Sequence, residues 1–270
     1  MPFAERGGFP THWTVRGNGS REALLIHCSL AHQGAWSGLA DVLSPWLKMT
    51  AFDTPGHGRS ADWDERGDYQ AVTTAMAADL IQDKADLVGH SFGATVALRL
   101  AVEQPDKVRS LTLIEPVFFA VLQGQNRDGF SKHLDTYQSV LDALDRGDAE
   151  LAASIFVENW GTGTPWRELP VRQRNYAADR IKQILNIQRQ IYDDEAGLAD
   201  RLQGLDLPVL ILDGTASPAI MSSVCDVLQR RIKGATRNRI EGAGHMLPIT
   251  HPSCVADRIA GFLQLGSIPE

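Results

Sequence analysis

The sequence predicts an α/β fold in which a mostly parallel sheet is flanked by helices and interrupted by a helical insertion. Two observations carry this prediction. Short apolar runs alternate with helical patterns along most of the chain, which is typical of parallel sheets covered by helices. Strand signals then vanish between Phe118 and Leu207, where apolar residues recur only at helical spacing. We therefore expect an α/β core at residues 1–117 and 208–270 and a helical cap, or lid, at residues 118–207.

Five short apolar runs are predicted to be buried parallel strands of the core. Each run is too short for a helix, and each is bounded by turn residues such as glycine, proline or aspartate. The runs are Ala23–Cys28, Met49–Asp53, Ala85–Val88, Ser110–Glu115 and Pro208–Asp213.

Helices are predicted between these strands and within the cap. In the core, apolar residues recur every fourth position over residues 72–80, after a capping residue at Asp68, and residues 94–102 are rich in helix formers. In the cap, a spacing of three and four occurs in residues 130–144 and again in residues 181–192. An insertion at the carboxyl ends of parallel strands lies where open α/β sheets bind ligands. We therefore interpret the cap as a lid.

The composition limits the partners and the compartment. The chain has 270 residues, with 26 Lys and Arg against 33 Asp and Glu and a formal charge of -7. Nucleic acids and anionic membranes need a basic surface, so this balance argues against both as partners. Three cysteines at irregular spacings, Cys28, Cys225 and Cys254, predict neither a disulfide framework nor a zinc site. The sequence shows no leader pattern and no membrane-spanning run. We expect a cytoplasmic protein that acts on a small molecule.

The motif Gly89-His90-Ser91-Phe92-Gly93 lies between a predicted strand and a predicted helix. Glycines two positions before and after Ser91 permit a tight strand-to-helix turn, whose strained central residue points its hydroxyl away from the sheet. The amino end of the following helix places partial positive charge beside a developing oxyanion. This context predicts that Ser91 is a nucleophile.

Several further motifs, in the same order, resemble the α/β-hydrolase superfamily over nearly the whole chain. They are Leu24–His27 followed by Gly34 and Trp36, the loop Asp53–Ser60 and the segment Gly242–His245. The resemblance implies an α/β-hydrolase fold with a helical cap and a serine nucleophile. It also implies that His245 is the general base, because the histidine of the family follows the last strand. None of the other seven histidines is as well placed.

The third member of the triad departs from the family pattern. A serine needs a base, and the base needs a group that fixes its tautomer. The resemblance implies an aspartate at position 217, but this chain has Ser217. Two carboxylates remain near the predicted site, Glu115 and Asp213, each at the end of a predicted strand. Some members of the family carry the acid after the sixth strand, so we favour Glu115, with Asp213 as the alternative acid. A site without a carboxylate, or with one elsewhere, stays open.

An oxyanion hole needs two backbone N–H donors aimed at the developing charge. Phe92 supplies one, and the resemblance aligns the other with Ser29, with Leu30 as the runner-up. Cys28 stands where the family usually has glycine, which restricts the backbone of this loop. We expect Cys28 to be a small buried residue and not a nucleophile.

These residues predict a serine hydrolase of small organic esters or related acyl substrates, acting through an acyl-enzyme without a metal or organic cofactor. Hydrolysis of carbon–carbon bonds, thioester hydrolysis and perhydrolysis stay open on the same residues, because a fold does not fix a function. A lyase or transferase without a full triad and a non-catalytic ligand-binding protein or receptor are further alternatives. Seven large residues are candidates for an apolar pocket, although most are expected in the core: Trp36, Phe118, Phe119, Phe156, Trp160, Trp166 and Met246.

Overall fold

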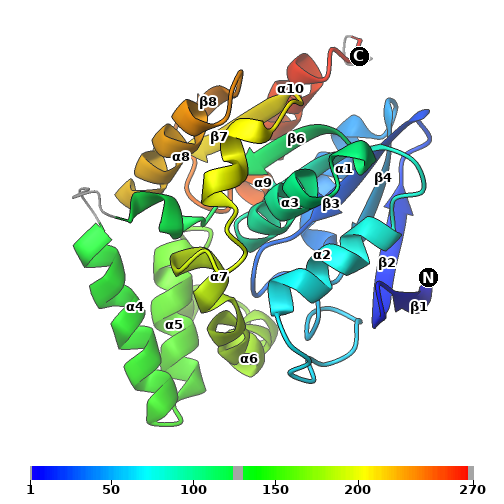
Figure 1. Cartoon of the computed structure of the whole chain (residues 1–270). Helices are drawn as coiled ribbons and strands as arrows, with labels where there is room; N and C mark the ends of the chain where they lie inside the picture. The colour runs from blue at the N-terminus through cyan, green and yellow to red at the C-terminus, as the bar shows by residue number, and fades with distance from the viewer. Residues whose placement is uncertain (1, 124–129, 267–270) are drawn as a thin grey trace.

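A computed structural model describes residues 2–123 and 130–266, and in this part of the chain eight strands form one sheet (Figure 1). The strand order is β1-β2-β4-β3-β5-β6-β7-β8. From β4 to β8 the neighbouring strands are parallel, whereas β2 pairs antiparallel with both β1 and β4. The strands are β1 (Phe3–Arg6), β2 (Phe9–Arg16), β3 (Arg21–Ile26), β4 (Leu47–Phe52), β5 (Ala85–His90), β6 (Val108–Ile114), β7 (Val209–Gly214) and β8 (Thr236–Ile240).

The five strands predicted from apolar runs correspond to β3 to β7, with ends that shift by up to two residues. The sequence patterns do not predict β1, β2 and β8. Of these, β1 and β8 are the edge strands and β2 lies next to β1, and most residues of β1 and β8 are partly or fully exposed. An edge strand that faces water does not need a continuous apolar run, so its sequence lacks the signal that a central strand carries.

Helices cover both faces of the sheet and bury alternate side chains of the same strands. Leu24 and Ile26 of β3 pack with α2, α3 and α8 on one face. Ala23 and Leu25 pack with α1 and α10 on the other face. This alternation follows from the two-residue period of a strand. The core helices are η1 (Gln33–Trp36), α1 (Ser37–Leu43), α2 (Tyr69–Asp79), α3 (Phe92–Glu103), η2 (Pro105–Lys107), α8 (Ala219–Arg231), α9 (Leu247–Thr250) and α10 (Pro252–Phe262).

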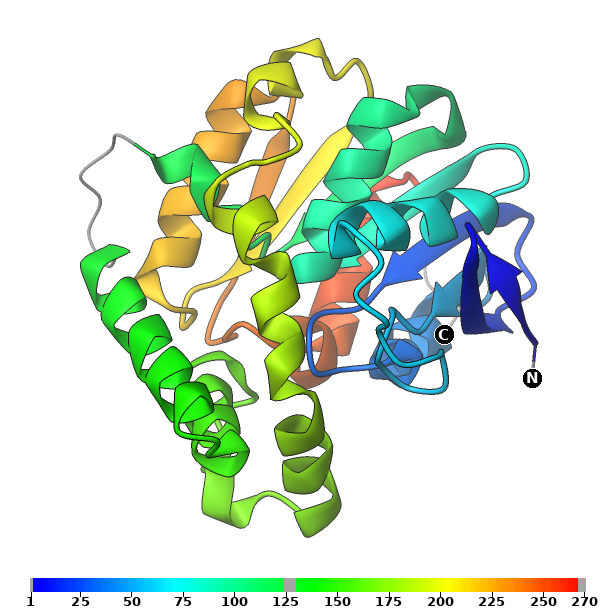
Figure 2. The ribbon, with the colours of Figure 1, turned by 60° about the horizontal axis from the view of Figure 1, so that its bottom comes forward.

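In the described residues, the chain between β6 and β7 consists of helices joined by loops, and most of these helices gather on one side of the core (Figure 2). Much of it has an apolar cluster of its own, in which Val140 and Ala143 of α4 pack against Ala152 and Ala153 of α5. Its elements are η3 (Phe119–Leu122), α4 (Phe130–Asp145), α5 (Ala149–Trp160), η4 (Trp166–Glu168), α6 (Val171–Arg180), η5 (Ile181–Ile187), α7 (Gln188–Tyr192) and η6 (Ala199–Gly204). We keep the name cap for residues 118–207, whose boundaries as a separate domain stay a prediction.

Candidate active site

Ser91 lies at a sharp turn between β5 and α3. Its φ and ψ angles are 56° and -117°, a sparsely populated conformation that costs about 1 to 3 kcal/mol. The turn also requires its glycines. A Cβ atom on Gly93 would lie 2.1 Å from the carbonyl oxygen of Ile26, and one on Gly89 would lie 2.3 Å from the carbonyl oxygen of Gly93. The close approach of β3 and α3 therefore excludes larger residues and fixes Ser91 at the end of β5.

His245 and Glu115 form a buried hydrogen-bonded pair. Glu115 follows β6 with a φ of 48°, and its backbone N–H donates to Leu212 on the neighbouring strand at 2.8 Å. His245 lies in the loop after β8, and its Nδ1 is 2.9 Å from Glu115 Oε2. The side chains of Glu115 and His245 are 0% and 4% exposed, so water does not compete for this contact. The pair can hold the imidazole in the tautomer that leaves Nε2 free to accept a proton.

Ser217 contributes to the same carboxylate. Glu115 Oε1 accepts hydrogen bonds from the backbone N–H of Gly214 at 2.8 Å and from the Ser217 hydroxyl at 2.7 Å. The residue that replaces the expected aspartate is therefore a donor to the glutamate on the neighbouring strand. Together with His245, these groups give both Glu115 oxygens a partner.

The alternative acid, Asp213, is held by two arginines. Its two oxygens accept from Arg237 at 2.7 and 2.6 Å, and Oδ2 also accepts from Arg239 at 3.1 Å. Within the part of the chain that the structure describes, Asp213 makes no hydrogen bond with His245. The geometry thus brings Glu115, and not Asp213, to the imidazole.

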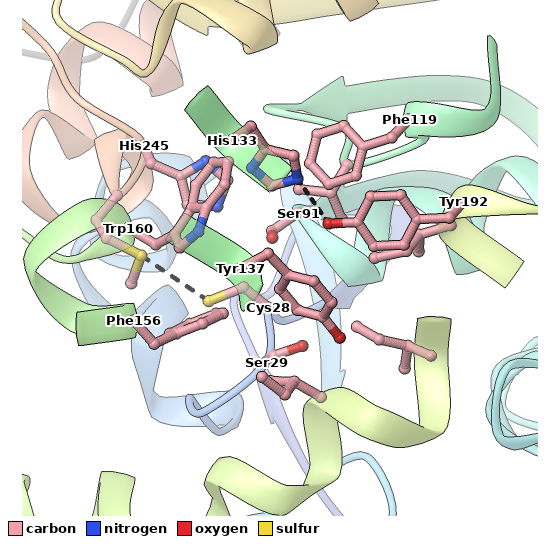
Figure 3. A pocket seen from close by; sticks show the side chains of 15 residues that line it. Cys28, Ser29, Ser91, Phe119, His133, Tyr137, Phe156, Trp160, Tyr192 and His245 are labelled. Atoms are coloured by element: carbon pink, nitrogen blue, oxygen red, sulfur yellow. Dashed lines mark hydrogen bonds between the residues drawn. The ribbon is translucent and has the colours of Figure 1, made fainter. Parts of the chain in front are cut away.

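Ser91 and His245 line the same cavity (Figure 3). Over the described ranges, no hydrogen bond joins the Ser91 hydroxyl to the His245 ring; catalytic hydrogen bonds are often longer before substrate binds. Two rings hold the imidazole in place. The Trp160 ring lies 4.7 Å from the His245 ring, edge to face. His90 Nε2 donates to the backbone oxygen of His245 at 2.9 Å, and burial lowers the pKa of His90 well below its usual value.

The two predicted oxyanion donors lie beside the cavity. Phe92 is the first residue of α3, where a backbone N–H has no acceptor within its own helix. Ser29 lines the cavity, and its backbone N–H meets no acceptor among the described residues. By contrast, the N–H of Leu30 donates to His57 Nε2 at 3.1 Å. Burial lowers the pKa of His57 to about 3, so the ring stays a neutral acceptor. The runner-up donor is therefore already occupied, which favours Ser29.

Cys28 is buried at the cavity wall. Burial raises the pKa of its thiol to about 12, so the sulfur stays protonated and a poor nucleophile.

Most of the other histidines have structural partners. His12 Nδ1 lies 2.7 Å from Asp53 Oδ2, and His27 Nε2 accepts from the backbone of Thr54 at 3.0 Å. His251 is the N-cap residue of α10, directly before Pro252. His133 differs, because it lies on α4 of the cap and lines the cavity.

The cavity lies between the core and the cap. Four of the seven predicted pocket residues line it, namely Phe119, Phe156, Trp160 and Met246, whereas the other three pack in the core or within the cap. The sequence patterns do not single out the polar aromatic residues of the wall, whose only signal is their helical spacing in the cap. The lining consists of Cys28, Ser29, Ser91, Val117, Phe119, His133, Tyr137, Phe156, Trp160, Ile184, Ile187, Ile191, Tyr192, His245 and Met246.

In residues 2–123 and 130–266, no group of three or more histidine, cysteine, aspartate or glutamate side chains is arranged to hold a metal ion. In the same residues, no helix is long and apolar enough to cross a membrane.

Comparison with known proteins adds a family and several relatives. A profile of the alpha/beta hydrolase family matches residues 23–258. The chain is 25% identical to a pimeloyl-(acyl-carrier protein) methyl ester esterase of Yersinia pseudotuberculosis, an alignment that covers 94% of this chain and 97% of that protein. It is 27% identical to the protein of that name from Neisseria meningitidis, over 90% of this chain and 77% of that protein. The solved structure of the carboxylesterase CesB from Bacillus subtilis is similar with a TM-score of 0.74 and 17% identity, over 98% of this chain and 91% of that one.

Proposed function

The chain belongs to the alpha/beta hydrolase family and is an ester hydrolase, and we propose that it cleaves small organic esters through an acyl-enzyme. In this proposal Ser91 is the nucleophile, His245 is the general base and Glu115 is the acid that orients it. The single observation that carries the assignment is the contact of 2.9 Å between His245 Nδ1 and the fully buried Glu115, at the same cavity as the strained Ser91.

The reaction proceeds in two halves. His245 Nε2 takes the hydroxyl proton as Ser91 Oγ attacks the ester carbonyl carbon, and the Glu115 carboxylate stabilises the imidazolium that forms. The N–H groups of Phe92 and Ser29 donate to the tetrahedral oxyanion, each worth about 3 kcal/mol of barrier. His245 then gives its proton to the departing alcohol, which leaves an acyl-Ser91 ester. A water molecule, deprotonated by His245, hydrolyses that ester and frees the serine.

The walls of the cavity support an uncharged, largely apolar substrate. Isoleucine and aromatic side chains such as Ile187, Phe119 and Phe156 dominate the lining, and no lysine or arginine is among the lining residues that the structure describes. Such a surface binds alkyl or acyl groups by removing their apolar area from water.

A fluorophosphonate probe tests this function, because it reacts with a serine hydroxyl that a base has activated. The probe is expected to label Ser91 in the native chain and to fail in His245→Ala. p-Nitrophenyl esters of increasing acyl length then measure kcat/KM. A folded chain that neither reacts with the probe nor hydrolyses any ester would support the non-catalytic alternative.

A second candidate uses the same chemistry on an acyl group that is attached to a carrier protein. The curated relatives from Yersinia and Neisseria are named for such a substrate. Residues 161–190 of the cap support this candidate, because they hold six Lys and Arg against two Asp and Glu, although the whole chain has a charge of -7. The six are Arg167, Arg172, Arg174, Arg180, Lys182 and Arg189. A basic cap would steer an acidic carrier toward the cavity.

Ionic strength separates the two candidates. Raising the salt from 0.01 M to 0.5 M shortens the Debye length from about 30 Å to below 8 Å and so screens long-range attraction. If the acyl group arrives on an acidic carrier protein, kcat/KM for the carrier ester falls with salt while kcat/KM for a neutral p-nitrophenyl ester stays constant. Equal behaviour of both esters would count against a carrier substrate. We also propose a cytoplasmic location, which the three free cysteines support.

A further inference from the structure

Two polar side chains face each other in the largely apolar wall of the cavity. His133 Nε2 of α4 lies 2.6 Å from the Tyr192 hydroxyl of α7 (Figure 3). Aromatic rings surround the pair, with Phe119 at 4.4 Å and Trp160 at 5.6 Å from the His133 ring. His133 is only 7% exposed. No other hydrogen bond to either side chain occurs in residues 2–123 and 130–266.

The pair contains one hydrogen-bond donor more than its own contact uses. A neutral imidazole has one N–H and a tyrosine has one O–H, so the two side chains hold two polar hydrogens. If Tyr192 donates to Nε2, the Nδ1–H of His133 is left over. If Nε2–H donates to the Tyr192 oxygen, the tyrosine hydrogen is left over. Burial lowers the pKa of His133 to about 4, so the ring is neutral near pH 7 and this count holds.

A polar hydrogen that this contact leaves over can donate to a group on a ligand, because both side chains line the cavity that Ser91 lines. We propose that the His133–Tyr192 pair determines specificity by donating to a second, uncharged oxygen of the substrate, such as a carbonyl, amide or ether oxygen remote from the ester that Ser91 attacks. This inference rests on the proposed ester hydrolysis and names the class of ester that the site prefers.

Charge excludes a remote carboxylate from this class. The pair is neutral, and among the lining residues that the structure describes none is a lysine or arginine that could compensate an anion. A carboxylate that left water for this wall would lose its hydration without an ionic partner. An uncharged oxygen loses less hydration and still satisfies the spare donor.

The substrate preference of the native chain is the first test. Wild-type kcat/KM is measured for p-nitrophenyl hexanoate and for isosteres in which one distal methylene is replaced by an ether oxygen or a carbonyl group. Each value is divided by the rate of hydroxide-catalysed hydrolysis of that ester, which removes intrinsic reactivity. We expect a preference of about 10- to 100-fold for an oxygen at one chain position, since that oxygen accepts a hydrogen bond from the pair. No preference at any position would overturn the inference.

Substitutions assign the preference to the pair. Each single variant, His133→Phe or Tyr192→Phe, leaves one polar hydrogen, so only the double variant removes the donor, and the preference is expected to fall to about 1 there. Tyr137→Phe is the comparison variant, because it removes another hydroxyl of the cavity lining, one that accepts from Gln188 Nε2 and points away from Ser91 (Figure 3). Its preference should equal that of the wild type. A preference that falls in this variant instead would overturn the role of the pair.

The outcomes separate the two proposals. A double variant that still hydrolyses both esters with the wild-type preference would overturn the role of the pair while leaving ester hydrolysis intact. A wild-type chain that hydrolyses no ester and resists the fluorophosphonate probe would instead refute the proposed function, and this inference with it.

Discussion

Replacing Glu115 by glutamine tests the assignment of the acid with almost no change in shape. The carboxylate accepts from Gly214 N–H and Ser217 Oγ at one oxygen and contacts His245 Nδ1 at the other. In Glu115→Gln, the amide oxygen keeps two hydrogen bonds if it faces Gly214 and Ser217. The amide NH₂ then faces the imidazole and donates to Nδ1.

This orientation forces His245 into the wrong tautomer. With Nδ1 as an acceptor, the ring proton moves to Nε2, which then donates toward Ser91 and cannot take its proton. A comparable substitution in another serine triad costs about 10⁴ in kcat, or about 5 kcal/mol of barrier. We expect a loss of that order here. The free energy of unfolding should change little, because the glutamine side chain fills the same volume and keeps the partners on Gly214 and Ser217.

Hydrolysis of p-nitrophenyl esters measures the loss, and the rate of fluorophosphonate labelling checks it at Ser91. Asp213→Asn is the matched control, because it removes a buried carboxylate of the neighbouring strand that contacts Arg237 and not His245. We expect it to lower stability, while kcat/KM of the folded protein falls less than about tenfold. Equal losses of kcat/KM in the two variants, or Glu115→Gln with more than a tenth of wild-type activity, would refute the reasoning.

Three further outcomes follow from burial and close packing. Gly93→Ala should unfold the chain or destabilise it by several kcal/mol, since its Cβ would lie 2.1 Å from a carbonyl oxygen. The Cβ of Gly261→Ala in α10 would meet no atom within 4 Å, so this variant should stabilise the chain by about 0.5 to 1 kcal/mol. Urea unfolding compares the two variants. Iodoacetamide at pH 8 should modify exposed Cys254 and spare buried Cys28, whose pKa is raised to about 12, and mass spectrometry of modified Cys28 in the folded chain would contradict this. Burial lowers the pKa of His27 to about 4, so the unfolded chain binds a proton that the folded chain does not between pH 6.5 and 4. The free energy of unfolding should therefore decrease by about 3 kcal/mol from His27 as the pH is lowered from 6.5 to 4. A urea midpoint that stays constant over this range would argue against this.

The sequence predicts the central strands and the turn at Ser91 because burial on both faces and tight turns restrict residue type. Gly89 is needed where β5 turns back against α3, and Gly93 where β3 approaches α3, so the motif and its context suffice for the prediction. The edge strands β1 and β8 carry no such restriction, because water can hydrogen-bond to the backbone of their outer side. The spacing of apolar residues predicts that the cap is helical. It does not single out the polar residues of the cavity wall, because these follow the same helical spacing as residues that only pack.

The choice between the two carboxylates depends on a strand that the sequence does not predict. Glu115 and Asp213 end neighbouring parallel strands, which lie about 4.8 Å apart, so each could reach the same imidazole. Arg237 and Arg239, both on β8, bind Asp213 and hold it away from the site. Without β8, only the resemblance to the family favours Glu115 over Asp213 in the sequence.

The identities of residues 115 and 217 depend on each other, because their side chains share a hydrogen bond. An aspartate at position 217 would lie beside Glu115, and two carboxylates at this distance repel each other when both are ionised. The Ser217 hydroxyl instead donates to Glu115 Oε1 at 2.7 Å and so stabilises the carboxylate that contacts His245. A site of this kind can therefore take its acid from either of two adjacent strands, provided that the other position supplies a donor or stays neutral. This reciprocity explains why the departure from the family pattern at position 217 accompanies a buried acid at position 115.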